Sequence, residues 1–241
     1  MNFRKFAIKY IPLLLIAVLI VSLAVLSLVN TLNAPDFDGN RTQTIIIAVI
    51  KTLPTLVTLI VQVLLVSANR NAFLLGGCNA ALYGVSYLLQ GLNFSAISAL
   101  LISSPIQIIS FFTWKKNSSG KEVRFKRMSP LVLALTVGLI LAGWAGCYFG
   151  LSRFFDGSYP ALDALTFSIG TVVTFIVAMR YIESQYMNTV SCLIALVMYI
   201  MMSIKDPTNM SYIVISLYNL VKVLQAAISW TKQYISQKNA G

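Results

Sequence analysis

The chain alternates long apolar runs with short polar segments, and the runs are long enough to cross a membrane. A helix needs about 20 predominantly apolar residues to span the hydrocarbon core. The first unbroken run covers residues 11–29, and seven more follow at about 44–67, 71–90, 94–114, 130–149, 162–180, 185–204 and 210–230. The pattern predicts an all-α integral membrane protein with eight transmembrane helices.

The fourth run has polar residues near its middle and a sharp boundary at its end. Ser103, Ser104, Pro105 and Gln107 interrupt it, and Trp114 closes it before a basic loop. Polar side chains this deep usually face a cavity or a neighbouring helix. An aromatic residue followed by cations is typical of the cytoplasmic interface. The run therefore predicts a helix with a functional face and a cytoplasmic end.

Composition and charge agree with this pattern. Of the residues, 58% are hydrophobic and 10% are charged, whereas soluble domains carry about 25% charged residues. The net charge of +11 does not call for nucleic acid, because the cations gather on one side of the predicted membrane. With the N-terminus inside, thirteen of the 18 Lys and Arg residues lie in inner segments and three in outer loops. This asymmetry favours eight spans with both termini cytoplasmic.

A weak internal repeat relates the two halves of the chain. A shift of 112 residues places Tyr87 on Tyr199 and Gln107 on Asn219. Spans 2–4 then correspond to spans 6–8, and the odd connector between them keeps the two units parallel. Transporters with such repeats bind their substrate between them. We expect one extra N-terminal helix and a 3+1+3 parallel-repeat core.

The predicted organisation has five parts. They are an N-terminal cytoplasmic segment with the first transmembrane helix and outer loop (1–43), a first three-helix repeat (44–114), a basic cytoplasmic loop with the connector helix (115–161), a second three-helix repeat (162–230) and a cytoplasmic tail (231–241).

The residue types that most catalytic and metal sites need are missing from the predicted spans. The chain has no histidine, which removes the commonest general base and metal ligand. Its seven acids fall in loops or at span ends, whereas ion-coupled pumps usually hold a carboxylate deep in the bilayer. Cys78, Cys147 and Cys192 lie in apolar runs without metal-ligand spacing. We expect no catalytic residue, no cofactor, no metal and no coupling to an ion gradient.

Polar residues inside the spans are the candidates for binding a small-molecule substrate. The alternative for each is a hydrogen bond between helices, and for the lysine a side chain that extends to the interface or pairs with a carbonyl. Tyr218, Asn219 and Lys222 share one face of the last span. The full candidate set is Gln107, Asn219, Lys222, Asn79, Tyr83, Gln185, Asn188 and Tyr218.

Two segments and the predicted topology resemble the PnuC-type family of bacterial vitamin and nucleoside transporters. The first segment is the end of the fourth run, residues 107–117, and the second is the inner turn at residues 178–188 with Arg180 and Glu183. The resemblance covers roughly residues 44–235. It implies a fold similar to the sugar-transporting SWEET proteins, often trimeric, in the bacterial inner membrane.

The resemblance also implies facilitated uptake of a nucleoside or nucleoside-like vitamin precursor, nicotinamide riboside or a deoxynucleoside. Relatives carry thiamine or riboflavin, and a cytoplasmic kinase phosphorylates and traps the substrate. Nicotinamide riboside carriers of the family tend to show Trp-x-x-Trp and then Asn at the start of span 7. Gln185, Asn188 and Cys192 stand at these positions here, which leaves room for a nucleoside that offers more hydrogen bonds.

Two other classes of function remain open at this stage. An intramembrane enzyme would have to use Lys222 or a tyrosine as its acid or base, because few other groups can do this work. A membrane subunit of a larger assembly would not transport anything alone. Product formation would identify the first, and loss of uptake in liposomes that hold only this chain would support the second.

Overall fold

The computed structural model describes residues 41–116, 118–119, 122–151, 159–205 and 210–239, together with five isolated positions between 18 and 29. The predicted first span at 11–29 and the outer loop after it lie outside this part of the chain. The elements are α2 (Arg41–Val66), α3 (Asn71–Leu88), α4 (Asn93–Ile97), η1 (Ser98–Ser103), α5 (Ser104–Lys116), β1 (Ser118–Ser119), β2 (Glu122–Val123), α6 (Pro130–Ala145), η2 (Gly146–Leu151), α7 (Pro160–Ala178), α8 (Glu183–Lys205) and α9 (Met210–Asn239).

The described residues confirm an all-helical membrane protein. Five helical segments are long and apolar enough to cross a membrane: Asn93–Lys116, Pro130–Gly150, Pro160–Ala178, Glu183–Lys205 and Tyr212–Asn239. They match the predicted spans 4 to 8. The predicted spans 2 and 3 are the helices α2 and α3, of which α2 contributes a shorter apolar stretch at Leu53–Val66. The total of eight spans stays a prediction.

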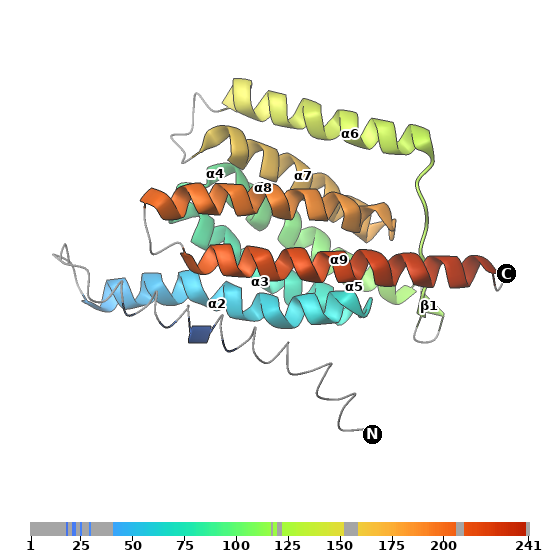
Figure 1. The fold of residues 1–241 in the computed structure, drawn as a ribbon, viewed down its shortest axis with the longest axis horizontal. Helices are drawn as coiled ribbons and strands as arrows, with labels where there is room; N and C mark the ends of the chain where they lie inside the picture. Colours follow the sequence, from blue (N-terminus) through green and yellow to red (C-terminus); the bar gives the residue numbers. More distant parts are fainter. Residues whose placement is uncertain are drawn as a thin grey trace.

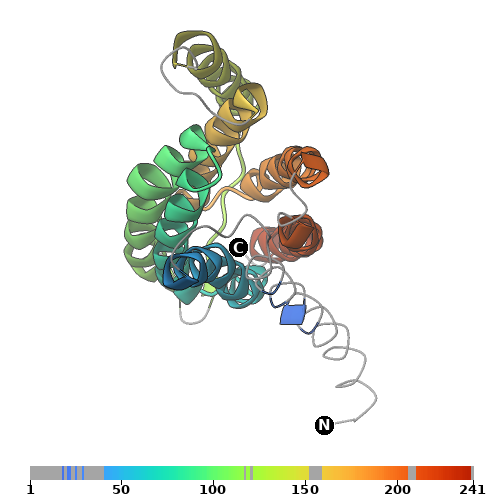
Figure 2. The ribbon, with the colours of Figure 1, turned by 90° about the vertical axis from the view of Figure 1, so that its left-hand side faces the viewer.

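Six helices form a closed ring. Along it, α2 packs on α3, α3 on α5, α5 on α7, α7 on α8, α8 on α9, and α9 returns to α2. The helix α6 lies outside the ring and packs on α7 (Figures 1 and 2). The indole of Trp144 on α6 fixes this contact by donating to the carbonyl of Ala161, at 3.1 Å.

The fourth predicted span changes its helical form halfway along. The π-helical segment η1 lies between α4 and α5, and it ends two residues before Pro105. Because Pro105 has no N–H, the carbonyl one turn earlier loses its usual partner and the helix is free to rearrange there. Such π-helical insertions often lie at functional sites, and here Ser98 and Ser103 of η1 reach the interior of the ring.

Each end of the ring is closed by a cluster of aromatic side chains. One cluster gathers around Leu92, Tyr199, Tyr212 and Tyr218. The other contains Trp114, Trp230 and two residues of the loop that follows α5, Val123 and Phe125. The sequence predicts a basic polar loop at 115–127, whereas the structure buries these two apolar side chains under the bundle. The space between the clusters holds the candidate site.

Candidate functional site

A cavity of about 300 Å³ lies inside the ring, between the α2–α5 group and the α7–α9 group. Sites for small molecules usually have volumes of about 300–1,000 Å³. The described lining contains no charged side chain. Its polar and aromatic members come from all six helices and are Thr58, Gln62, Asn79, Tyr83, Tyr87, Ser95, Ser98, Ser103, Gln107, Thr166, Phe167, Ser191, Tyr199, Tyr212, Ser216 and Asn219.

Three carboxamide oxygens on this lining have no hydrogen-bond partner. They are Oε1 of Gln62, Oδ1 of Asn79 and Oδ1 of Asn219. Buried polar atoms are nearly always paired with protein, water or ligand. Three acceptors without partners in one cavity therefore favour an occupant that donates hydrogen bonds, such as hydroxyl or amino groups.

The position of Asn79 is fixed by its neighbours. Its Nδ2 donates to Oγ1 of Thr58 at 2.9 Å, so the carboxamide oxygen is the atom left over for the cavity. The Thr58 hydroxyl lies 2.8 Å from the carbonyl of Pro54 and 3.0 Å from the hydroxyl of Tyr83. This network orients one amide and one phenol toward the same space.

Gln107 reaches the cavity because Gly76 leaves room for it. A Cβ atom added at Gly76 would overlap Oε1 of Gln107. The sequence Gly76-Gly77 is predicted to serve close helix packing, and the structure shows α3 packed on α5 at this point. The glycine thus allows a polar side chain to cross the α3–α5 interface.

Tyrosine rings cover one end of the cavity. Tyr83 and Tyr87 stack with ring centroids 5.5 Å apart, and Tyr199 and Tyr212 do so at 5.2 Å. The hydroxyls of Tyr87 and Tyr199 are 3.5 Å apart and join the two stacks. Aromatic faces of this kind are suited to a planar ring. The lining therefore combines surfaces for a ring with acceptors for hydroxyl groups.

A second cavity of about 250 Å³ continues toward the other aromatic cluster. The two cavities adjoin at the residues that line both of them, which are Val61, Gln62, Ser103, Gln107 and Gly170. The second cavity adds Ser110 and Asn188. The two spaces lie in series along the interior of the ring.

The structure brings together five of the eight predicted site residues. Asn79, Tyr83, Gln107 and Asn219 line the first cavity, and Asn188 joins Gln107 on the second. The sequence missed Gln62 as a site residue, although a glutamine within an apolar run is the same signal that identified Gln107. The sequence identifies Tyr87 and Tyr199 only as a repeat pair.

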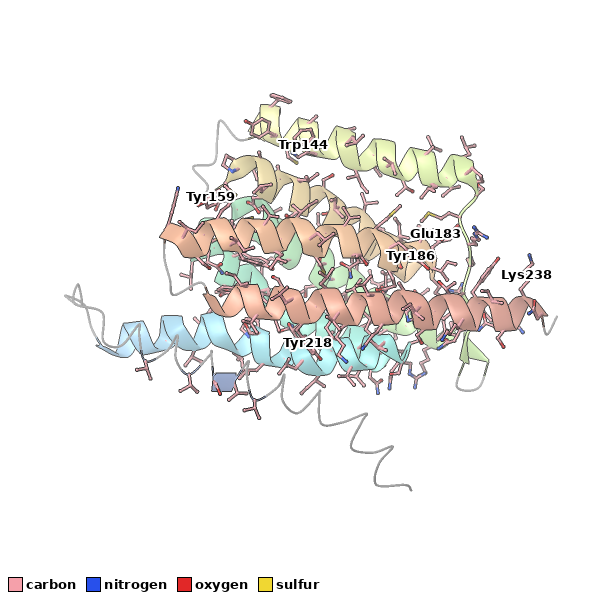
Figure 3. All side chains as sticks on the ribbon, viewed as in Figure 1. Trp144, Tyr159, Glu183, Tyr186, Tyr218 and Lys238 are labelled. Carbon is pink, nitrogen blue, oxygen red and sulfur yellow. The ribbon has the colours of Figure 1, made fainter. Side chains whose placement is uncertain are left out.

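The structure does not place the other three on either cavity. Tyr218 on α9 (Figure 3) is buried, and its hydroxyl donates to the carbonyl of Leu59 at 3.1 Å. Lys222 turns away because its amine donates to Oε1 of Gln225 at 3.0 Å. Its stem lies beside Tyr218, with Nζ 5.7 Å from the ring centroid. Gln185 is fully buried near the start of α8, and neither atom of its amide has a partner.

Residues separated by 112 positions recur as pairs on the cavity lining. The pairs on the first cavity are Thr58/Gly170, Asn79/Ser191, Ala80/Cys192, Tyr83/Ala195, Tyr87/Tyr199, Ser103/Ile215 and Gln107/Asn219. The second cavity adds Val61/Val173, Gln62/Thr174 and Leu65/Val177. The shift that relates the halves of the sequence thus also relates opposite walls of the interior.

One acid is buried near the cavity, and it has a structural partner. Asp163, in the first turn of α7, accepts from the backbone N–H groups of Phe94 at 2.9 Å and Ser95 at 3.0 Å, and from the Ser95 hydroxyl. The carboxylate therefore caps the start of α4 from a helix of the other group. It is not among the residues that line either cavity.

Membrane-length helices in a closed ring around an uncharged polar cavity are the features of a helical membrane transporter. The family model described as nicotinamide mononucleotide transporter matches residues 48–232. This chain belongs to that family, which confirms the PnuC-type resemblance. A solved structure titled "Crystal structure of the Vitamin B3 transporter PnuC" has a similar fold, with a TM-score of 0.69 and 18% identity over 92% of each chain. A comparison with curated proteins gave no match.

Proposed function

We propose that this protein carries a nucleoside or nucleoside-like vitamin precursor across the membrane by facilitated, uncoupled diffusion. The observation behind the proposal is the uncharged cavity with stacked tyrosines at one end and unpaired carboxamide oxygens on its wall. A nucleoside offers a planar ring to the tyrosines and sugar hydroxyls to the amides. No covalent step on the substrate is part of this function.

The absence of charge in the described lining favours an unphosphorylated substrate. A phosphate would lose its hydration on entering the cavity, and no Lys or Arg of the described lining compensates for that loss. Uncompensated burial of a charge costs several kcal/mol or more. We therefore favour nicotinamide riboside or a deoxynucleoside over the mononucleotide in the family's name.

The proposed mechanism is alternating access of α2–α5 against α7–α9 within a 3+1+3 core. Two observations support it. The first helix of each group packs on the last helix of the other, α2 on α9 and α7 on α5. Residues 112 positions apart also face one another across the cavity. Both are expected of two parallel repeats related by an axis along the membrane normal.

The setting of this transport is part of the same proposal. We place the protein in the bacterial inner membrane with eight spans and both termini in the cytoplasm. A cytoplasmic kinase would phosphorylate the substrate and prevent its return. A homotrimer is proposed from the family resemblance alone.

The test is a binding and uptake panel on the purified protein. Thermal shift should identify a ligand among nicotinamide riboside, thymidine, deoxyadenosine, thiamine and riboflavin. Nicotinamide mononucleotide is the matched control, since it differs from the riboside by one phosphate, and it should bind more weakly. Proteoliposomes that hold only this chain should then take up the best ligand. Equal or tighter binding of the mononucleotide, or no uptake of any compound, would contradict the proposal.

A further inference from the structure

The segment Val123–Met128, named the strap here, crosses the end of the ring between α5 and α6. Its side chains alternate: Val123, Phe125 and Met128 are buried, whereas the cationic side chains between them are exposed. Phe125 stacks on Trp230 with centroids 4.9 Å apart and meets the edge of Trp114 at 6.0 Å. These three aromatic side chains are named the plug, and they pack against one another at the end of the helix ring.

The plug contacts residues that line the second cavity. The indole of Trp114 donates to the carbonyl of Val177 at 3.1 Å, and that of Trp230 donates to the carbonyl of Leu65 at 3.1 Å. Leu65 and Val177 both line the second cavity and are 112 positions apart. Each tryptophan thus links the last helix of one group to the first helix of the other, through a residue that lines the cavity.

Polar contacts outside the plug attach the strap to α9, to the turn between α7 and α8 and to the start of α8. The side chain of Gln237 near the end of α9 donates to the carbonyl of Val123 at 2.7 Å and accepts from the N–H of Phe125 at 3.1 Å. Lys126 pairs through its backbone with the turn between α7 and α8, donating to Arg180 at 3.0 Å and accepting from Ile182 at 3.1 Å. Besides the stacking of Phe125 on Trp230, the strap is therefore held to elements of the second helix group by hydrogen bonds and by the 3.8 Å ion pair between Arg127 and Glu183.

The position of Gln237 makes its contact easy to break. The helix α9 has 30 residues, about 45 Å at 1.5 Å per residue, which exceeds the thickness of the hydrocarbon core. Its last turns, marked by Lys238 in Figure 3, extend past the ends of the other helices. There, water replaces a lost hydrogen bond, so the net cost is about 0.5–1.5 kcal/mol for each bond.

We propose that the strap is the inner gate of the carrier and that Gln237 is its latch. Release of Gln237 withdraws Phe125 from its contacts with the two tryptophans, whose rings also contact each other at 5.4 Å, and opens the second cavity to the cytoplasm. The proposal rests on the proposed transport function, but its geometry can be tested without a substrate.

The experiment measures access to a thiol in the second cavity. Ser110→Cys places the thiol there, because Ser110 lines this cavity and is 1% exposed. A membrane-impermeant thiol reagent is added to inverted or right-side-out vesicles, and modification at position 110 is followed by mass spectrometry. Gln237→Leu should speed modification about 5–100-fold in inverted vesicles, as expected for two lost hydrogen bonds. Phe125→Ala should act in the same direction.

Gln233→Leu is the matched control, since it makes the same change one turn earlier on α9, and it should leave the rate at the parent value. The proposal is overturned if Gln237→Leu and Phe125→Ala both react like the parent. It is also overturned if Gln233→Leu accelerates modification equally, or if the acceleration occurs only in right-side-out vesicles. Lack of uptake of every nucleoside would instead contradict the transport function and leave the labelling result unchanged.

Discussion

The carboxamide oxygen of Asn219 lies on the cavity wall without a partner. We predict that Asn219→Leu weakens substrate binding by about 1–3 kcal/mol, or about 5–150-fold, because one or two hydrogen bonds to the substrate are lost. Binding of the best ligand from the panel to a monodisperse variant measures this.

The control for Asn219 is one turn away on the same helix. Lys222→Met removes a charge whose amine contacts Gln225 outside the cavity, so its affinity should stay within about twofold of the parent, a difference under about 1 kcal/mol. If Asn219→Leu binds like the parent while Lys222→Met binds poorly, the substrate lies on the other face of α9.

Gly76 gives a test of the site that removes no polar group. Gly76→Ala should favour the helix by about 0.5–1 kcal/mol, yet the added methyl would displace the Gln107 side chain. We therefore predict weaker ligand binding in a variant that is folded and no less helical. Gly138→Ala on α6, where an added Cβ meets nothing within 4 Å, should bind normally. Equal binding by both variants would show that the orientation of Gln107 does not matter.

Among the elements, the contact between α4 and α7 depends on Asp163. Replacement by Asn removes the charge that strengthens its bonds to the backbone of Phe94 and Ser95. We expect Asp163→Asn to lower the free energy of unfolding by about 1–3 kcal/mol, seen as a lower melting temperature in detergent.

Glu183→Gln is the matched control for this substitution. It breaks only a 3.8 Å ion pair to the exposed Arg127, which should cost less than about 1 kcal/mol. Similar melting temperatures for the two variants would mean that the Asp163 cap adds little to the α4–α7 contact.

The helices that form the ring were predictable because lipid requires long apolar runs, and the runs give the elements directly. The position of Asn219 followed from the same reasoning, since a buried amide needs a partner. The direction of Lys222 did not, because its neighbours Tyr218 and Gln225 on the same helix compete for it. The burial of Phe125 was also missed, since alternation over six residues of a basic loop is a weak signal.

At the scale of the whole molecule, the distribution of Lys and Arg residues among the loops predicts on which side of the membrane the strap lies. We predict that Ser118 is cytoplasmic and that Gly157, outside the described residues, is on the opposite side. The apolar segment Pro130–Gly150 between them is long enough to cross the bilayer once. Cysteine labelling at the two positions should show opposite sidedness, and labelling from the same side would refute the eight-span topology.

The residues that line the two cavities bear on the energy source of transport. No acid lines either cavity in the described part of the chain, and the buried Asp163 is occupied by the backbone of α4. A carrier without a carboxylate in its cavity lacks the group that commonly binds a proton or cation in coupled transport. Proteoliposomes should therefore bring the substrate to equal concentrations on both sides without accumulating it, and an imposed proton or sodium gradient should not change that end point. Asp163→Asn provides the internal check, because it should transport to the same end point if the protein is folded. Uphill accumulation driven by either gradient, abolished in Asp163→Asn, would show instead that this carboxylate is the coupling group.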